Sequence, residues 1–289
     1  MENNNTKWYL LVFLGTIWGS SFLLMKLGLN GVNSIQLGSL RILFASAFLL
    51  LIGFKHIAKI PLHKWKFIAL TSIFGTFLPV YLFALALSKI DSSISSILNA
   101  LTPLNTLIVG ILFFGITAQR RQIFGVVIGF VGCVLLVLFG ESQNTSENYY
   151  YAILIFIAAL FYGINVNLIK KHLSDLKPLT ISTGNFTVMV IPALVILFFS
   201  GFFEIVSQHN VQVSLGYIAI LGIIGTGLSN ILFFRLIQIS SPVFAASVTY
   251  IIPVVAIVLG YFVMKETLTF IQGIGAFVVL IGVYFSSRK

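Results

Sequence analysis

Ten continuous apolar stretches occupy most of this chain and constrain its fold more than any other feature. They are residues 8–27, 35–54, 67–87, 92–114, 122–139, 149–169, 179–200, 214–237, 243–264 and 270–286. A helix needs roughly 20 apolar residues to cross the hydrocarbon core of a bilayer. The runs are continuously apolar rather than alternating, which predicts helices. We therefore expect an all-α integral membrane protein with ten transmembrane helices and no soluble domain between them.

The composition and the distribution of charge agree with a lipid environment. Hydrophobic residues make up 58% of the chain and charged residues 8%, whereas about a quarter of residues are charged in soluble domains. The net charge of +10 does not indicate nucleic acid, because the basic residues stand in short segments beside the apolar stretches. With a cytoplasmic N-terminus, 13 of the 17 Lys and Arg residues fall on the cytoplasmic side. This predicts a multi-pass protein of the cell (inner or plasma) membrane with both termini cytoplasmic.

The chain also repeats itself. An offset of 150 residues aligns 73–139 with 223–289 and matches "IFGTFL" to "IIGTGL" without a gap. An offset of 144 residues places "WGSSFLLMK" at 18–26 over "YGINVNLIK" at 162–170. These matches predict a duplicated five-helix unit, at 8–139 and 149–286. Because five is odd, the second unit enters the membrane from the opposite side, and inverted repeats of this kind are typical of secondary transporters.

Two matched prolines, Pro103 in "NALTPLNTLIVG" and Pro253 in "TYIIPVVAIVLG", interrupt the apolar pattern. Each proline removes a backbone donor and is expected to free the carbonyl four residues earlier, at Asn99 and Thr249. In lipid, a free carbonyl needs a protein partner or water in a cavity. Small and polar residues recur at helical spacing around both prolines, which predicts that these helices line a wet pathway. The alternative is that small residues only allow close helix packing.

Several short motifs together resemble one transporter family. "WGSSF" at 18–22, "LRILFASAFLL" at 40–50, the two prolines and the duplication are similar to EamA-type transporters of the drug/metabolite transporter superfamily. The sequence departs from that family at Gly115-Ile116 and Lys265-Glu266, where such repeats often carry a Gly-Glu pair. The resemblance implies export of a small metabolite, amino-acid-like or another small polar or amphipathic solute. It also implies a central cavity surrounded by the helices at 8–27, 67–87, 92–114, 149–169, 214–237 and 243–264.

The expected substrate pathway combines the polar stripes with the polar and aromatic residues of these helices. It comprises Trp18, Ser21, Arg41, Thr76, Tyr81, Asn99, Pro103, Thr106, Tyr162, Asn165, Ser229, Asn230, Thr249, Tyr250 and Pro253. Trp18 serves equally well as a packing aromatic, and Lys26 is expected to snorkel at a helix end. Arg41 stands about seven residues inside its stretch, and a charge at that depth is usually paired or functional.

Catalytic alternatives find no support in the sequence. All four histidines fall between the apolar stretches, and no Gly-Lys-Ser/Thr phosphate loop is present. We therefore expect no enzyme, no cofactor and no metal, and a monomer that binds a small-molecule substrate and the lipid bilayer but no nucleic acid. All seven acids also fall between the stretches or at their ends, so exchange down the solute gradient is the simplest form of coupling. The alternative function is a non-transporting membrane receptor or scaffold with the same fold.

Overall fold

A computed structural model of the chain describes residues 5–89, 92–138, 150–264 and 270–286, and every regular element in these residues is a helix. In chain order the elements are α1 (Thr6–Gly28), α2 (Ser34–Ile57), η1 (Leu62–Lys64), α3 (Trp65–Ser72), η2 (Ile73–Phe77), α4 (Leu78–Leu87), α5 (Ser92–Asn99), α6 (Thr102–Phe114), α7 (Arg120–Leu138), α8 (Tyr150–Leu168), η3 (Ile169–Leu173), α9 (Pro178–Phe199), α10 (Phe202–Ile205), α11 (His209–Gly222), η4 (Ile223–Leu228), α12 (Ser229–Ile239), α13 (Pro242–Ala246), α14 (Val248–Met264) and α15 (Phe270–Ser286). Each of the ten apolar stretches is mainly helical over its described residues. The all-α class is therefore confirmed for this part of the chain.

Within the described residues, six continuous helical rods are long and apolar enough to cross a membrane. They are Thr6–Gly28, Ser34–Ile57, Leu62–Leu87, Tyr150–Leu173, Pro178–Phe199 and His209–Ile239. Shorter apolar helices lie at Thr102–Phe114, between the third and fourth rods, and at Pro242–Val255 and Gly273–Ser286, after the sixth. The total of ten spans stays a prediction.

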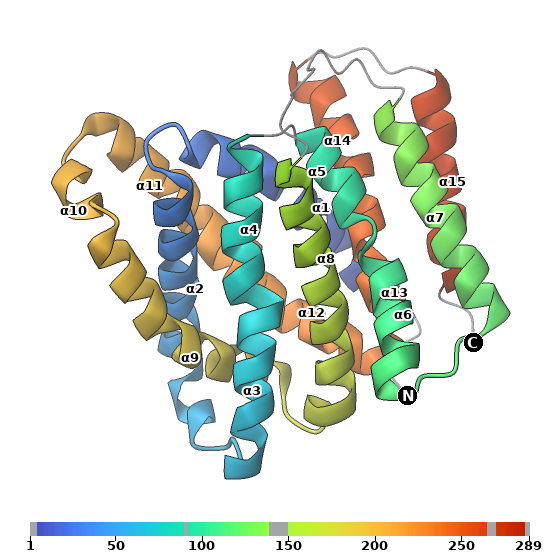
Figure 1. Cartoon of the computed structure of the whole chain (residues 1–289), viewed down its shortest axis with the longest axis horizontal. Coiled ribbons are helices and arrows are strands. Elements are labelled where there is room, and N and C mark those ends of the chain that lie inside the picture. The colour runs from blue at the N-terminus through green and yellow to red at the C-terminus, as the bar shows by residue number, and fades with distance from the viewer. Residues whose placement is uncertain (1–4, 90–91, 139–149, 265–269, 287–289) are drawn as a thin grey trace.

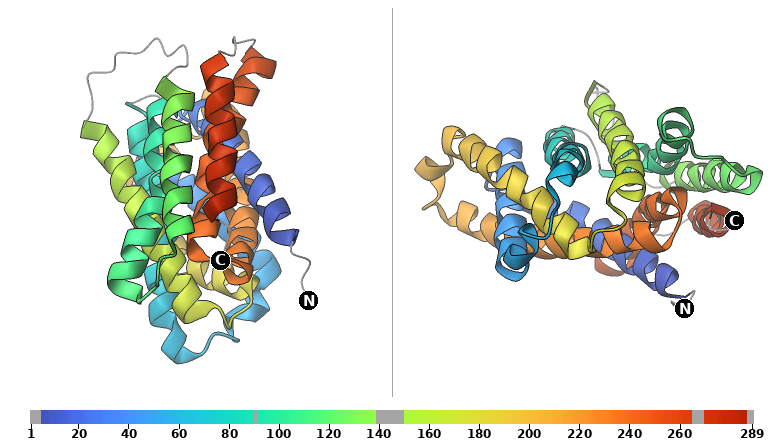
Figure 2. Two further views of the ribbon diagram at one scale, coloured as in Figure 1. Left: turned by 90° about the vertical axis from the view of Figure 1, so that its right-hand side faces the viewer. Right: turned by 90° about the horizontal axis from the view of Figure 1, so that it is seen from below.

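The rods lie side by side in an elongated bundle (Figure 1). α9, α10 and α11 form one end of the bundle, and α7 and α15 form the other. α4, α8 and α1 lie between these ends, and the view from below in Figure 2 shows the same elongated outline. Large apolar side chains such as Phe113, Phe199 and Phe277 remain exposed on the outside, as expected for a lipid-facing surface.

Two antiparallel helix pairs hold the bundle together at its two ends. In the first pair, Gln36 of α2 donates from Nε2 to the Ser200 carbonyl after α9, at 3.0 Å. At the opposite end of the same pair, His56 Nδ1 lies 3.0 Å from Thr180 Oγ1. The early part of α2 therefore faces the end of α9, and the late part of α2 faces its beginning.

The second pair, α7 and α15, packs through glycines. A methyl group added at Gly132 would come within 2.6 Å of the Val279 backbone nitrogen, and one added at Gly125 within 2.8 Å of the Gly282 carbonyl oxygen. Only glycine lets the two backbones approach this closely, as in other small-residue membrane interfaces. Gly125 faces a later part of α15 than Gly132 does, so this pair is antiparallel as well (Figure 1).

The long rods carry π-helical turns where the repeat predicts equivalent positions. η2 and η4 begin at Ile73 and Ile223, 150 residues apart. Hydroxyls satisfy the looser ladder of η4, since Thr226 Oγ1 donates to the Leu221 carbonyl at 3.2 Å and Ser229 Oγ to the Ile224 carbonyl at 2.8 Å. Single π-turns often occur at functional sites.

The two prolines differ from the expectation that both lie in the middle of a helix. Pro103 stands in the first turn of α6, after a break at 100–101, whereas Pro253 lies inside α14. A proline in a first turn costs little, because its missing N–H has no helical partner there. The Asn99 carbonyl is not free either, since Thr102 Oγ1 donates to it at 2.7 Å. A local hydroxyl therefore takes the place that we expected water to fill.

Some expectations fall on residues outside the described ranges. These are residues 139 and 149 at the edges of the two units, the Lys265-Glu266 pair, and the acids Glu2, Asp91, Glu141 and Glu147.

Candidate functional site

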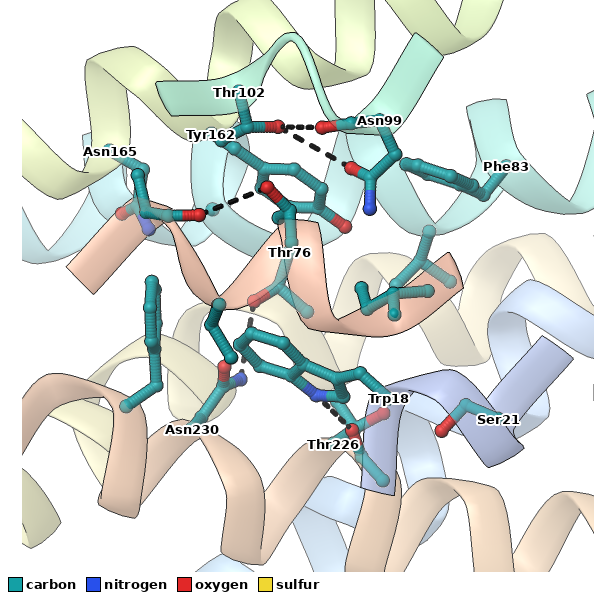
Figure 3. Close-up of a pocket in the computed structure, with 18 of the residues that line it drawn as sticks. Trp18, Ser21, Thr76, Phe83, Asn99, Thr102, Tyr162, Asn165, Thr226 and Asn230 are labelled. Atoms are coloured by element: carbon teal, nitrogen blue, oxygen red, sulfur yellow. Dashed lines mark hydrogen bonds between the residues drawn. The ribbon is translucent and has the colours of Figure 1, made fainter. Parts of the chain in front are cut away.

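A cavity of about 100 Å³ opens among helices from both halves of the chain (Figure 3). A buried water needs about 10–15 Å³ by this kind of measurement, so the space holds several waters or one small solute. α1, α2, η2, α5, α8, η4, α12 and α14 all contribute side chains to its wall. Nine of the expected pathway residues line it: Trp18, Ser21, Arg41, Thr76, Asn99, Tyr162, Asn165, Asn230 and Thr249.

The other six expected residues lie outside the lining, and four of them use their hydroxyls elsewhere, with Ser229 bonded to the Ile224 carbonyl of η4 as described above. Tyr81 pairs with Ser39 at 2.9 Å between the two hydroxyl oxygens. Tyr250 is fully buried and donates to the Val126 carbonyl at 2.8 Å. Thr106 donates to the carbonyl one turn earlier in its own helix, at 2.8 Å. The remaining two are Pro103 and Pro253.

The cavity also contains residues that the expected set omitted. Thr226 and Thr102 supply hydroxyls, and Phe22, Phe83 and Phe233 supply aromatic surface. Helical spacing could have selected the two threonines, because they stand on the same faces as selected residues. No sequence signal separates the three phenylalanines from the many other aromatics of an apolar chain.

Trp18 connects the two halves of the chain at the cavity wall. Its Nε1 donates to the Gly225 carbonyl in η4 at 3.0 Å, and its ring meets Phe233 edge-on with 5.0 Å between centroids. Figure 3 shows the indole between α1 and the helix that carries Asn230. Trp18 is therefore both a packing aromatic and a part of the lining.

Arg41 supplies the charge of the lining. Its Nε donates to Thr226 Oγ1 at 2.6 Å, and its Nη1 lies 3.6 Å from the Met25 sulfur. No Asp or Glu lines the cavity within the described residues. The expectation that Arg41 faces polar protein rather than lipid agrees with these contacts.

Amide groups complete the polar part of the wall. Asn230 Nδ2 in α12 lies 3.4 Å from Thr76 Oγ1 in η2, a long contact between the two halves of the chain. Asn165 Oδ1 is buried without a hydrogen-bond partner among the described residues. A buried acceptor of this kind is costly when it is left unpaired, so it suits a ligand or water donor. No cluster of three potential metal ligands occurs in the described residues.

A lysine ties the end of α8 and η3 to the end of α12. Lys170 Nζ in η3 donates to the carbonyls of Ile237, Gln238 and Ser240, at 3.0, 3.0 and 2.7 Å. The equivalent lysine by the 144-residue offset, Lys26, is exposed and makes no hydrogen bond or ion pair within the described residues. The two equivalent lysines therefore differ in their contacts.

A second lysine, Lys64, forms an ion pair beside the same end of α8. Its Nζ lies 2.6 Å from Asp175 Oδ1 and 2.7 Å from the His172 carbonyl. The Lys64 hydrogen bond lowers the pKa of the largely exposed Asp175 carboxyl. This pair links the start of the third rod to the segment between η3 and α9.

Family comparison identifies the chain. The model of the EamA-like transporter family matches it twice, at residues 6–138 and 150–288. The chain belongs to the EamA-like transporter family. The predicted family is thereby confirmed, and transporters, unlike enzymes, move solutes without converting them.

Three relatives that match this EamA-like chain over nearly their full length are named as transporters or as an efflux pump. An uncharacterized transporter of Archaeoglobus fulgidus is 24% identical over 99% of both chains. An uncharacterized inner membrane transporter of Escherichia coli is 27% identical over 94% of this chain and 88% of its own. A probable amino-acid metabolite efflux pump of Salmonella typhimurium is 24% identical over 96% and 93%. These matches support a multi-pass membrane protein.

A solved crystal structure has the same fold. It superposes with a TM-score of 0.74 and 15% sequence identity, over 96% of this EamA-like chain and 95% of the other.

Proposed function

We propose that this EamA-like protein is a secondary transporter that moves a small solute through the central cavity by alternating access. One observation carries the proposal: the cavity combines polar side chains and an arginine with an apolar wall, and it is built from both halves of an otherwise apolar helical chain. A site between two repeats can face each side of the membrane in turn. The nine lining residues that the sequence also selected are the proposed substrate contacts.

The contacts between equivalent helices support an inverted repeat. By the 144-residue offset, Gln36 is equivalent to Thr180, and His56 is equivalent to Ser200. The contact between Gln36 and Ser200 therefore has its mirror in the contact between His56 and Thr180. Reciprocal contacts of this kind define a two-fold axis. Since α2 and α9 are antiparallel, this axis relates two units of opposite orientation, which gives ten spans when all five helices of each unit cross.

The asymmetry between the two lysines supports alternating access. With the N-terminus in the cytoplasm, Lys170 ties the cytoplasmic ends of α8 and α12. Lys26, on the other side, is free of such contacts in the described residues. The structure then corresponds to a cytoplasm-closed state. The opposite state forms when Lys26 takes an equivalent cap and Lys170 releases its own.

The proposed solute is amino-acid-like, or another small polar or amphipathic metabolite, and the proposed direction is outward. The relative named a probable amino-acid metabolite efflux pump supports both statements. The cavity volume of about 100 Å³ and its mixed polar and aromatic wall also suit such a solute. No carboxylate lines the cavity in the described residues, which supports exchange without a coupled proton or sodium ion.

Counterflow in liposomes tests the function. A thermal-shift screen against the 20 common amino acids first selects a stabilising solute, and vesicles loaded with that solute then receive a radioactive trace of it outside. We expect transient uptake of the tracer without any pH or sodium gradient. Asn230→Phe, which fills the cavity, should abolish uptake, whereas Gly216→Phe, at a position with open space around it, should not.

Two outcomes would contradict this account. Binding without flux for every stabilising solute would favour the receptor or scaffold alternative. Accumulation driven by a proton gradient alone would refute uncoupled exchange and direct attention to Asp91 and Glu266, which lie outside the described residues.

A further inference from the structure

We infer that the Arg41 guanidinium binds a carboxylate group of the solute, so that the cavity selects small carboxylates with an apolar body. The inference rests on the proposed transport function and names the class of substrate that the same cavity takes.

The first argument is the number of unused donors on Arg41. A guanidinium has five N–H donors, and within the described residues only Nε and one Nη1 hydrogen are engaged, with Thr226 and with the Met25 sulfur. No carboxylate of the described residues pairs with it. An arginine within a membrane-spanning helix usually pairs with an opposite charge, because an isolated charge at that depth is costly. A bound anion would supply the missing partner.

The second argument is the orientation of the guanidinium. The Thr226 hydroxyl donates to the Leu221 carbonyl at 3.2 Å, and it accepts from Arg41 Nε at 2.6 Å. This relay holds the Nε edge against η4. Three of the four Nη hydrogens have no partner among the described residues, and Arg41 lines the cavity. A planar carboxylate, with two oxygens, matches such a fork better than a single hydroxyl or carbonyl does.

The third argument is that the charge is not required by the helix packing. Asn185 is the equivalent of Arg41 by the 144-residue offset. Asn185 is fully buried and satisfied inside the protein, since its side-chain amide lies 3.0 Å from Thr71 Oγ1. A neutral amide therefore serves in the equivalent place of α9. Arg41 lines the cavity and Asn185 does not, so the positive charge is found only at the position that faces the cavity among these two.

The rest of the cavity defines the body of the solute. Trp18, Phe83, Tyr162 and Phe233 give an aromatic wall, which favours a small apolar group next to the carboxylate. The unpartnered Asn165 Oδ1 can accept from an ammonium group. Amino acids with apolar side chains therefore belong to the proposed class, along with simple monocarboxylates.

A pair of nearly isosteric probes tests the inference by equilibrium binding. 4-Methylpentanoate and 4-methylpentanamide differ in charge but hardly in shape, and L-leucine adds an ammonium group. We expect the purified protein to bind the acid at least tenfold more tightly than the amide, measured by calorimetry and, in a background where Trp8 and Trp65 are replaced by phenylalanine, by the fluorescence of Trp18. In Arg41→Gln the acid should lose tenfold or more in affinity, whereas the amide should change less than twofold.

Three variants control for charge and folding. Lys55→Gln removes one positive charge from an exposed position of the same helix and should leave both affinities unchanged. Arg41→Lys keeps the charge but loses the fork, so it should give an intermediate affinity. If Arg41→Gln does not fold, Arg41→Lys and Thr226→Val still test the site, because both should weaken the acid more than the amide.

Several results would overturn the inference. They are equal binding of acid and amide by the wild type, an unchanged acid preference in Arg41→Gln, tighter binding of inorganic phosphate than of any carboxylate, and no binding of acetate, 4-methylpentanoate or L-leucine. Flux is measured separately. Counterflow of a neutral solute with no carboxylate preference would leave the transport function intact and refute the anion site, whereas carboxylate binding without flux would do the reverse.

Discussion

The three hydrogen bonds from Lys170 should set the balance between the two states of the transporter. Lys170→Met keeps the length of the side chain and removes its three donors to Ile237, Gln238 and Ser240. Each hydrogen bond contributes a net of about 0.5–1 kcal/mol, because water replaces it in the open state. The closed state therefore loses about 1.5–3 kcal/mol in total, a shift of roughly 10–150-fold toward the cytoplasm-open state.

Cysteine accessibility measures this shift. Ser21→Cys places a thiol on the cavity wall, in a background where the buried Cys133 is replaced by alanine. A membrane-impermeant thiol reagent applied from the cytoplasmic side should modify this thiol much faster in the Lys170→Met variant. The rate is proportional to the open fraction while that fraction is small, so an increase of at least tenfold is expected.

The matched control is Lys171→Met. It removes the same charge from the next residue, whose Nζ makes a long, exposed contact of 3.4 Å with the Phe114 carbonyl and lies 5.5 Å from the centroid of the Phe114 ring. Its modification rate should stay within twofold of the parent. Equal rates in Lys170→Met and Lys171→Met would refute the gate, and a faster rate only from the outer side would reverse the proposed orientation.

Three further predictions concern packing, charge and exposure. Gly132→Ala should lower the melting temperature or the yield, since its methyl group would meet the backbone across the α7–α15 pair, whereas Gly216→Ala, with open space, should stabilise the helix by about 0.5–1 kcal/mol. The Lys64–Asp175 ion pair should make the wild type more stable than Asp175→Asn by at most about 1 kcal/mol. Because the pair lowers the folded-state pKa of this carboxyl, the stability difference should be present above about pH 5 and disappear as the pH falls below about 4. A stability difference independent of pH would contradict this origin. A cysteine at Asn99 should react with water-soluble thiol reagents and one at the fully buried Tyr250 should not; equal reactivity would place the pathway elsewhere.

The sequence was sufficient for features that depend on local composition and period. Continuous apolar runs have to be helices in lipid, because only a helix satisfies all its backbone groups within one segment. The described helices accordingly coincide with the ten stretches to within a few residues at most ends. The matched segments "IFGTFL" and "IIGTGL" coincide with two π-helical regions of the structure. Their equivalence was visible in the sequence, but nothing in the sequence predicted π-turns.

The site was predictable only in part, because a helical stripe identifies a face but not its neighbour. Asn99 and Tyr250 both stand on polar stripes, yet Asn99 lines the cavity and Tyr250 points to the Val126 carbonyl. Pro103 looked like a costly interruption, but the chain breaks before it, and Thr102 satisfies the Asn99 carbonyl. Whether a hydroxyl faces water, a neighbouring helix or its own backbone depends on contacts between segments far apart in the chain.

Patterns along the chain thus predicted the lipid environment of this protein, its helical class, its duplication and its family, since each of these follows from one chain segment or from a match between two. Three-dimensional packing alone brings Arg41 of the first half to Thr226 of the second, lets Lys170 cap α12 while Lys26 is left exposed, and joins α1 to η4 through Trp18. These pairings arise from side-chain packing between helices more than 60 residues apart, and no periodicity within a single helix encodes its partner.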